Sequence, residues 1–171
     1  IPQVMPGSFC ARNNTFSICG KVLREDNVPL PNVEVKLSGF KTATATTNEN
    51  GLYCFDLLEG NQNYTITPFK NTDHKNGING GDVTAIRKHI LALEKLNSPY
   101  KIIAADVNKS STVNSGDVTE IRKLILALIN QFSSNTSWLF VPKTHSFSNP
   151  QNPFNSSFPT SISFNSLNTD Q

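Results

Sequence analysis

The chain has 171 residues, of which 37% are hydrophobic and 16% charged, and its formal net charge is only +2. So small a charge provides no strong field for nucleic acid or an anionic membrane, and no apolar run approaches the roughly 20 residues of a membrane helix. We therefore expect no nucleic-acid partner and no membrane insertion. The length suits two small modules. Because Ile1 is not an initiator Met, we expect a processed product or a piece of a larger protein.

Residues 15–70 contain five short runs in which apolar and polar residues alternate. Clusters of Asn, Asp, Gly and Pro separate the runs, which predicts strands joined by tight turns. The predicted strands are residues 16–22, 33–37, 42–47, 52–57 and 64–67. Five strands at this spacing favour a small β-sandwich at residues 15–70, in an α+β chain built of several modules.

Three motifs on these strands resemble a known group of domains: Ile18-x-Gly20-x-Val22, Pro31-Asn-Val33-x-Val35-x-Leu37, and Thr47-x-x-x-Gly51-x-Tyr53-x-Phe55. They resemble the carboxypeptidase regulatory-like and Cna protein B-type families. The resemblance implies a prealbumin-like sandwich, used as a spacer in secreted and surface proteins.

Three cysteines occur, Cys10, Cys19 and Cys54, too few for a disulfide scaffold. Cys19 and Cys54 both alternate away from the predicted core, so a disulfide can join them if their strands are neighbours. Cys10 then remains free or intermolecular. Pairing of Cys10 with either of the others is the alternative.

An internal repeat occupies the middle of the chain, where residues 81–93 recur as 116–128 with 11 of 13 positions identical. Apolar residues recur at helical spacing in both copies, with Arg and Lys on the opposite side. These apolar positions are Val83, Ile86, Ile90 and Leu93, and Val118, Ile121, Ile125 and Leu128. We expect two amphipathic helices of about three turns that pack on one another.

An oxygen-rich stretch of twelve residues precedes the second helix. Alternate positions of such a loop direct their oxygens to one centre, as a hard cation such as calcium requires. The predicted ligands are Asp106, Asn108, Ser110, the carbonyl of Thr112, Asn114 and Asp117. The two carboxylates balance one divalent ion. The sixth position, usually Gly, is Ser111.

The stretch before the first helix is a weaker copy of this loop. Its corresponding residues are Asn71, Asp73, Lys75, the carbonyl of Gly77, Asn79 and Asp82. Lys75 brings an ammonium group to a position where a ligand oxygen belongs, and it repels a cation unless it turns into solvent. Two interpretations stay open: a second calcium site, or a turn that only caps the helix.

Two such loops, each followed by one exiting helix and each ending in Asp rather than Glu, resemble the type I dockerin repeat over about residues 71–131. The resemblance implies Ca²⁺ as cofactor and a cohesin as partner, bound in either of two orientations. It implies partner contacts at Gly80, Gly81, Arg87 and Lys88, and at Ser115, Gly116, Arg122 and Lys123. The Arg-Lys pairs are equally expected on a solvated helix face.

Residues 132–171 are rich in Asn, Ser, Thr and Pro and carry isolated aromatic residues. We expect an extended arm that lies on the dockerin-like repeat or on a neighbouring copy, because so many aromatic rings are costly to leave in water. Residues 1–14 are expected to be an N-terminal extension. The whole composite resembles modules of large secreted proteins of Bacteroidota.

No hydrolase, phosphate-loop or dinucleotide motif occurs, so we expect no enzyme. Two function classes remain open. In the first, the chain is a calcium-binding structural and assembly module, such as a stalk or fibre unit, of an extracellular or cell-surface protein. Its partners are then neighbouring copies or modules of the same protein. In the second, it is a dockerin that docks a polysaccharide-degrading or surface enzyme onto a cohesin.

Overall fold

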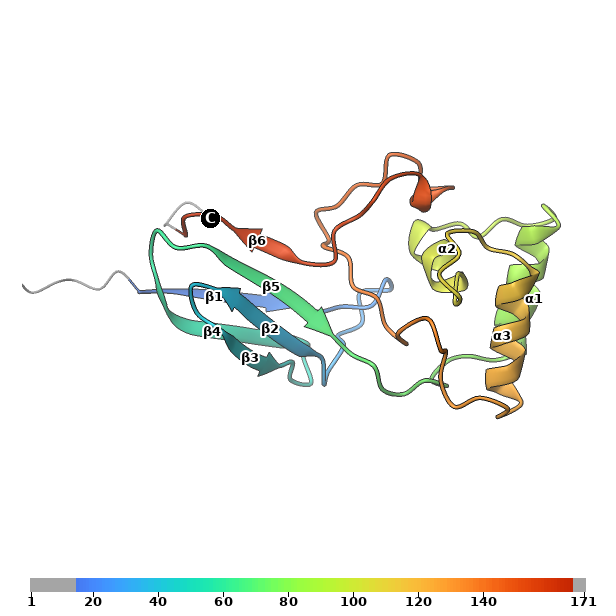
Figure 1. Cartoon of the computed structure of the whole chain (residues 1–171), viewed down its shortest axis with the longest axis horizontal. Helices are drawn as coiled ribbons and strands as arrows, with labels where there is room; N and C mark the ends of the chain where they lie inside the picture. The colour runs from blue at the N-terminus through green and yellow to red at the C-terminus, as the bar shows by residue number, and fades with distance from the viewer. Residues whose placement is uncertain (1–14, 168–171) are drawn as a thin grey trace, which may run out of the picture.

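The structure, a computed structural model, describes residues 15–167 and has strands gathered at one end and helices at the other (Figure 1). The predicted N-terminal extension, with Cys10, lies outside the described residues. In chain order the elements are β1 (Thr15–Lys21), β2 (Glu34–Gly39), β3 (Ala43–Thr46), β4 (Leu52–Glu59), β5 (Tyr64–Phe69), α1 (Gly80–Ile90), α2 (Pro99–Ala105), α3 (Ser115–Ile125), the 3-10 helix η1 (Pro153–Asn155) and β6 (Ile162–Phe164).

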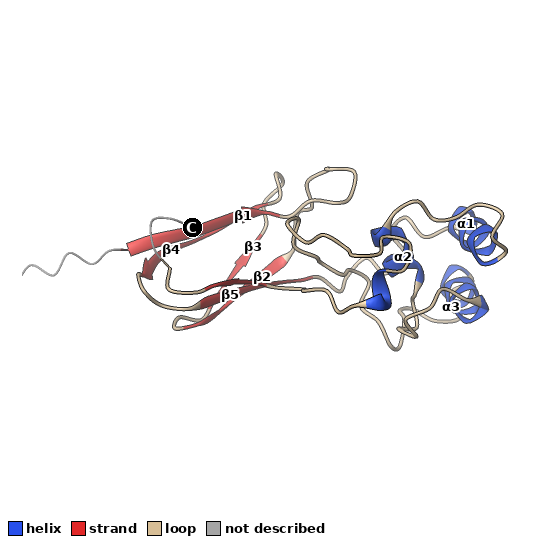
Figure 2. Ribbon diagram, turned by 90° about the horizontal axis from the view of Figure 1, so that it is seen from above, coloured by secondary structure: helices blue, strands red, loops and turns tan. Residues whose placement is uncertain are grey.

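The strands form two antiparallel sheets, which we call the β unit together with their turns. One sheet pairs β1 with β4, and the other has the order β3-β2-β5-β6. Both sheets contribute to one core, because alternate residues of each strand point inward. Figure 2 shows the two sheets facing each other. Val35 and Leu37 of β2 are fully buried, and Ile18 and Phe55 of the other sheet belong to the same core. The five predicted strands are all present.

The turn after β2 depends on Gly39. This residue has φ of 113°, and a Cβ atom there would collide with the carbonyl oxygen of Asn63. Only glycine adopts this conformation without strain, and it lets the turn approach the start of β5.

The two-stranded sheet carries the cysteine pair. The register of β1 and β4 places Cys19 opposite Cys54, with Cα atoms 4.0 Å apart, and the two residues form a disulfide. Both side chains face solvent. The covalent link joins two strands that have no further sheet partner among the described residues.

The helical unit, residues 71–130, contains α1 and α3 packed side by side and antiparallel (Figure 1). Each helix begins with a capping box, in which Asn79 or Asn114 accepts a hydrogen bond from the first turn. Val83 and Ile86 of α1 pack with Val118, Ile121 and Leu124 of α3 in one core. No described helix is both long enough and apolar enough to cross a membrane.

Both helices are shorter than the sequence predicts. They end because Ala92 and Ala127 adopt left-handed φ angles of 56° and 57°, so that the amides of Leu93 and Leu128 bond back to Lys88 and Lys123. The last two apolar positions predicted for each helix are therefore exposed: Ile90, Leu93, Ile125 and Leu128. The prediction that these four residues lie in the core between the helices is wrong.

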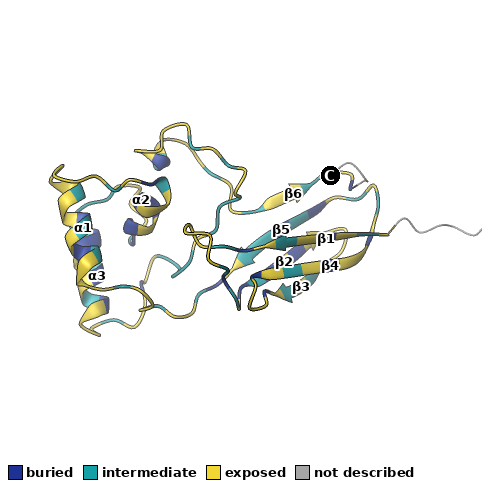
Figure 3. Cartoon of the chain, turned by 180° about the vertical axis from the view of Figure 1, so that it is seen from behind, coloured by how far each residue is buried: buried dark blue, intermediate teal, exposed yellow. Residues whose placement is uncertain are grey.

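The C-terminal arm, residues 132–167 of the structure, returns from the helical unit to the β unit. Its strand β6 pairs with β5 and lies beside it at the edge of the sheet (Figure 3). The buried Leu167 joins the core, with Trp138, Phe140 and Phe164 packed against that core. The arm also contacts α2, where Phe147 meets the Tyr100 ring edge-on. The helical unit is thus inserted between two neighbouring strands.

We expected the arm to pack on the dockerin-like repeat or on another copy, and it does contact the repeat, for example through Phe147 against Tyr100 of α2. The sequence did not predict that the arm continues to the β unit. The edge of β5 offers free backbone groups, and Leu167 fills an apolar space that the two sheets share. These local partners within the same chain explain where the arm ends.

Candidate calcium loops and docking surface

Loop two, residues 106–117, brings its two carboxylates inside the helical unit. Asp106 is 4% exposed and Asp117 is fully buried, although both are charged residue types that rarely reach such burial unpaired. The backbone N–H groups of Ser110 and Ser111 donate to Asp106 at 2.9 and 2.8 Å. Those of Asn108 and Asn114 donate to Asp117 at 3.3 and 2.9 Å. The loop therefore curls around both acids.

The remaining predicted ligands of loop two lie close together. The Ser110 hydroxyl donates to the Thr112 carbonyl at 3.0 Å, and the Asn114 amide donates to the Ser110 hydroxyl at 3.3 Å. The loop thus gathers carboxylate, amide, hydroxyl and carbonyl oxygens, the ligand chemistry that calcium prefers.

Charge balance also favours a cation at loop two. Within residues 15–167 neither Asp106 nor Asp117 forms an ion pair. Two buried carboxylates without a counter-charge are costly, and a divalent ion would offset both. The donor set of this loop fits Ca²⁺.

Ser111 occupies the position where such loops usually have Gly. Its φ of 61° is left-handed, as is the 58° of Lys109. The loop therefore makes its sharp turn at the expected position, with a serine in a conformation that glycine adopts more easily.

Loop one, residues 71–82, does not gather its predicted ligands in the same way. Asp82 accepts a hydrogen bond from the Asn79 amide at 2.8 Å, and the Asn79 side chain donates to the Gly77 carbonyl at 3.0 Å. Asn71 and Asp73 instead bond to residues outside the loop, and Lys75 is exposed. Only the predicted ligands in the half of loop one next to α1, which are Gly77, Asn79 and Asp82, lie close together.

The predicted partner residues lie on the helical unit with most side chains accessible. Gly80, Gly81, Arg87 and Lys88 on α1 are all exposed, whereas on α3 Ser115 and Arg122 are exposed and Gly116 and Lys123 are half-buried. The two lysines have acidic neighbours, since Lys88 bonds Glu94 at 2.9 Å and Lys123 bonds Glu120 at 2.7 Å. The bond from Lys88 lowers the pKa of the Glu94 carboxyl.

Sequence reasoning missed an apolar surface at the ends of both helices. Leu91 and Leu93 follow α1 with 64% and 75% exposure, and Leu126 and Leu128 follow α3 with 68% and 71%. The signal was present, because Ile-Leu-Ala-Leu occurs unchanged in both repeats. Helical periodicity, however, assigned Leu93 and Leu128 to the core and gave Leu91 and Leu126 no role. We call these two groups the leucine clusters.

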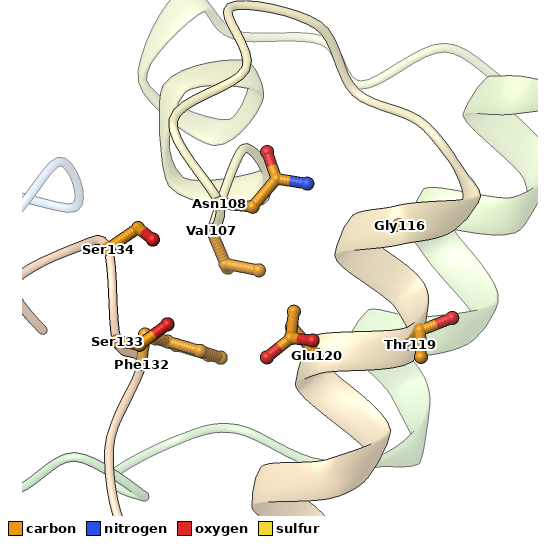
Figure 4. Close-up of a pocket in the computed structure, with 8 residues that line it drawn as sticks. All are labelled: Val107, Asn108, Gly116, Thr119, Glu120, Phe132, Ser133 and Ser134. Atoms are coloured by element: carbon orange, nitrogen blue, oxygen red, sulfur yellow. The ribbon is translucent and has the colours of Figure 1, made fainter.

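A shallow pocket of about 320 Å³ lies beside the first turns of α3 (Figure 4). Thr119 and Glu120 line it from the helix, and Phe132 and Ser133 line it from the start of the arm. The counterpart of Glu120 in the first repeat is Ala85. The two halves of the helical unit therefore differ in charge at this position.

Searches among curated proteins and among solved structures found no match to the chain. The comparisons also lend no support to the resemblance of residues 15–70 to carboxypeptidase regulatory-like and Cna protein B-type domains, or to a setting in Bacteroidota. Both stay interpretations of the sequence. Residues 71–126 do match a family model, that of the dockerin type I domain. The inserted helical unit of this chain is therefore similar to the dockerin type I domain over these residues.

Proposed function

We propose that the helical unit is a calcium-dependent docking module that binds a cohesin-type domain outside the cell or at its surface, without catalysis of its own. The observation that carries the proposal is the dockerin match over residues 71–126, which covers loop two and both helices. The acid pair of loop two supports the calcium requirement.

The leucine clusters support a protein partner. Exposed apolar residues that are grouped and bordered by charged residues are typical of interaction surfaces. Because α1 and α3 are antiparallel, the cluster after one helix lies towards the loop that begins the other (Figure 1). Asn130, just after α3, shares a pocket with Asp73 and Lys75 of loop one. The helical unit thus has two docking faces, one at the start of each helix. Each face combines the start of one helix with the Arg-Lys pair and the exposed leucines at the end of the other helix.

The two faces are similar but unequal. Glu120 and the arm residue Phe132 border the face at α3, whereas the first repeat has Ala85 at the equivalent position. We therefore propose that a partner binds the two faces with different affinities.

The stalk or fibre role has less support. Strand β6 pairs with β5 of its own chain, so this strand is not available for donation to a neighbour. Thr15 pairs with Glu59, and Leu167 bonds to Asn61, so both ends of the described chain lie at the same end of the β unit. This arrangement presents the helical unit at the far end from both (Figure 1).

Calorimetric titration with a cohesin domain tests the proposal. We expect binding in calcium and none after chelation. Substitution of two cluster residues, Leu93→Ser with Leu128→Ser, should weaken binding by at least about tenfold, since each buried leucine contributes on the order of 1.5 kcal/mol. Leu57→Ser is the matched control, because Leu57 is 71% exposed on the β unit.

Three outcomes contradict the proposal: no binding in calcium, equal binding with and without it, or equal loss in the control and the double variant. Circular dichroism of each variant establishes that its helices are intact.

A further inference from the structure

The two loops precede nearly identical helices but have different backbone conformations. In loop two the left-handed residues are Lys109 and Ser111, the fourth and sixth of the loop. In loop one they are Asp73 and Gly77, with φ of 59° and 79°, the third and seventh. A left-handed residue redirects the side chains that follow it, so loop one is not a second copy of the loop two fold.

Three residues at the start of loop one bind the returning arm. The side-chain oxygen of Asn71 accepts a hydrogen bond from the backbone N–H of Ser137 at 3.0 Å. The carbonyl of Thr72 accepts one from the Trp138 indole at 3.2 Å, and His74 Nδ1 contacts the Ser137 hydroxyl. Trp138 also packs against the core of the β unit. The first predicted ligand of loop one is thus committed to the arm.

The second predicted ligand has a different charged partner. The side chain of Lys70 is 7% exposed, and its ammonium lies 3.4 Å from the Asp73 carboxylate and 3.3 Å from the Asn32 carbonyl of the β unit. A buried ammonium needs a counter-charge, so Asp73 balances Lys70. Exposed Lys75 offsets the remaining carboxylate of the loop, Asp82, so loop one together with Lys70 has no net negative charge to balance a divalent cation.

Loop two also contacts the arm, but in a way that spares its ligands. The Asn135 side chain donates to the backbone carbonyl of Asp106 at 3.2 Å. The Asp106 carboxylate remains directed towards the N–H groups of Ser110 and Ser111. The arm therefore hydrogen-bonds to one predicted ligand side chain in loop one, that of Asn71, and to the backbone of a predicted ligand in loop two.

We propose that loop one is not a calcium site but the anchor that holds the arm against the helical unit, so that the chain binds a single Ca²⁺ ion. This revises the expectation that Asn71, Asp73, Gly77, Asn79 and Asp82 bind calcium. The inference rests on the proposed calcium binding by loop two and is independent of the docking partner.

Native mass spectrometry of the full chain with Ca²⁺ tests the number of ions. We expect one ion for the wild type and for Asp73→Asn, which keeps an oxygen near Lys70, and loss of that ion for the matched loop two variant Asp106→Asn. Two ions in the wild type, or an ion lost with Asp73→Asn, would overturn the inference and leave the docking function intact. No ion at all would contradict both.

Amide exchange followed by NMR tests the anchor. Because the Ser137 N–H donates to Asn71, we expect Asn71→Ala to speed exchange at Ser137 roughly fivefold or more, as befits the loss of one hydrogen bond. Asn76→Ala, at an exposed position of the same loop, is the control and should change nothing at Ser137. Unchanged exchange in Asn71→Ala would show that loop one does not hold the arm.

Discussion

Two alanines decide where the helices end. Ala92 and Ala127 adopt left-handed backbone angles, a conformation that costs a residue with a Cβ atom about 1–2 kcal/mol. Glycine is the usual residue at this position, and its absence removes the stop signal from the sequence. This is why periodicity carried both predicted helices too far and placed Leu93 and Leu128 in the core.

Ala92→Gly and Ala127→Gly should therefore stabilise the helical unit by about 1 kcal/mol each, because glycine adopts the left-handed angle without strain. The midpoint of urea unfolding, followed by helical circular dichroism in calcium, measures the change. Ala85→Gly, inside α1, is the control and should destabilise by about 1 kcal/mol. Destabilisation by all three substitutions would contradict the assigned helix ends.

At the scale of elements, the sequence predicted secondary structure best where buried residues recur at a regular spacing. Alternation in residues such as Val33, Val35 and Leu37 predicted the strands, because one face of each sheet covers the core. Strand β6 was missed because its three residues are too few for a period, and α2 because its buried Ile102 and Ile103 are adjacent. Both elements form through contacts with distant parts of the chain.

The candidate ligand set of loop two could be predicted from residue types alone, since its members are local in sequence; that they bind calcium stays a prediction. The engagement of Asn71 with Ser137 could not, because it joins residues 66 positions apart. Nor could the burial of the Lys70 ammonium between the Asp73 carboxylate and the Asn32 carbonyl, since it depends on how the β unit meets the helical unit. Local chemistry thus predicts a ligand set, and tertiary contacts decide whether it is available.

The arm completes the β unit through Leu167, which is 4% exposed. We expect Leu167→Ala to destabilise the β unit by about 2–4 kcal/mol, the usual range for a buried leucine. Ile162→Ala in β6 is the control, because Ile162 is 41% exposed and should cost less than about 1 kcal/mol. Chemical unfolding followed by fluorescence of Trp138 measures both. Equal effects would show that the arm does not plug the core.

At the scale of the whole molecule, the chain leaves the β unit after β5, builds the helical unit, and returns to the neighbouring edge as β6 (Figure 1). The sequence predicted modules in series, whereas the structure inserts one into the other. The β unit has its own core and the disulfide between β1 and β4, so we expect its stability to be independent of a metal. The helical unit has a smaller core and two buried acids, so its stability should depend on the ion.

The measurement that tests the central claim most directly is amide exchange across the full chain with calcium and after chelation. If one ion in loop two orders the docking module, chelation should speed exchange strongly in α1 and α3 and leave β2 and β5 protected, because binding energy at loop two is also folding energy. Unchanged protection of α3 after chelation would contradict the account.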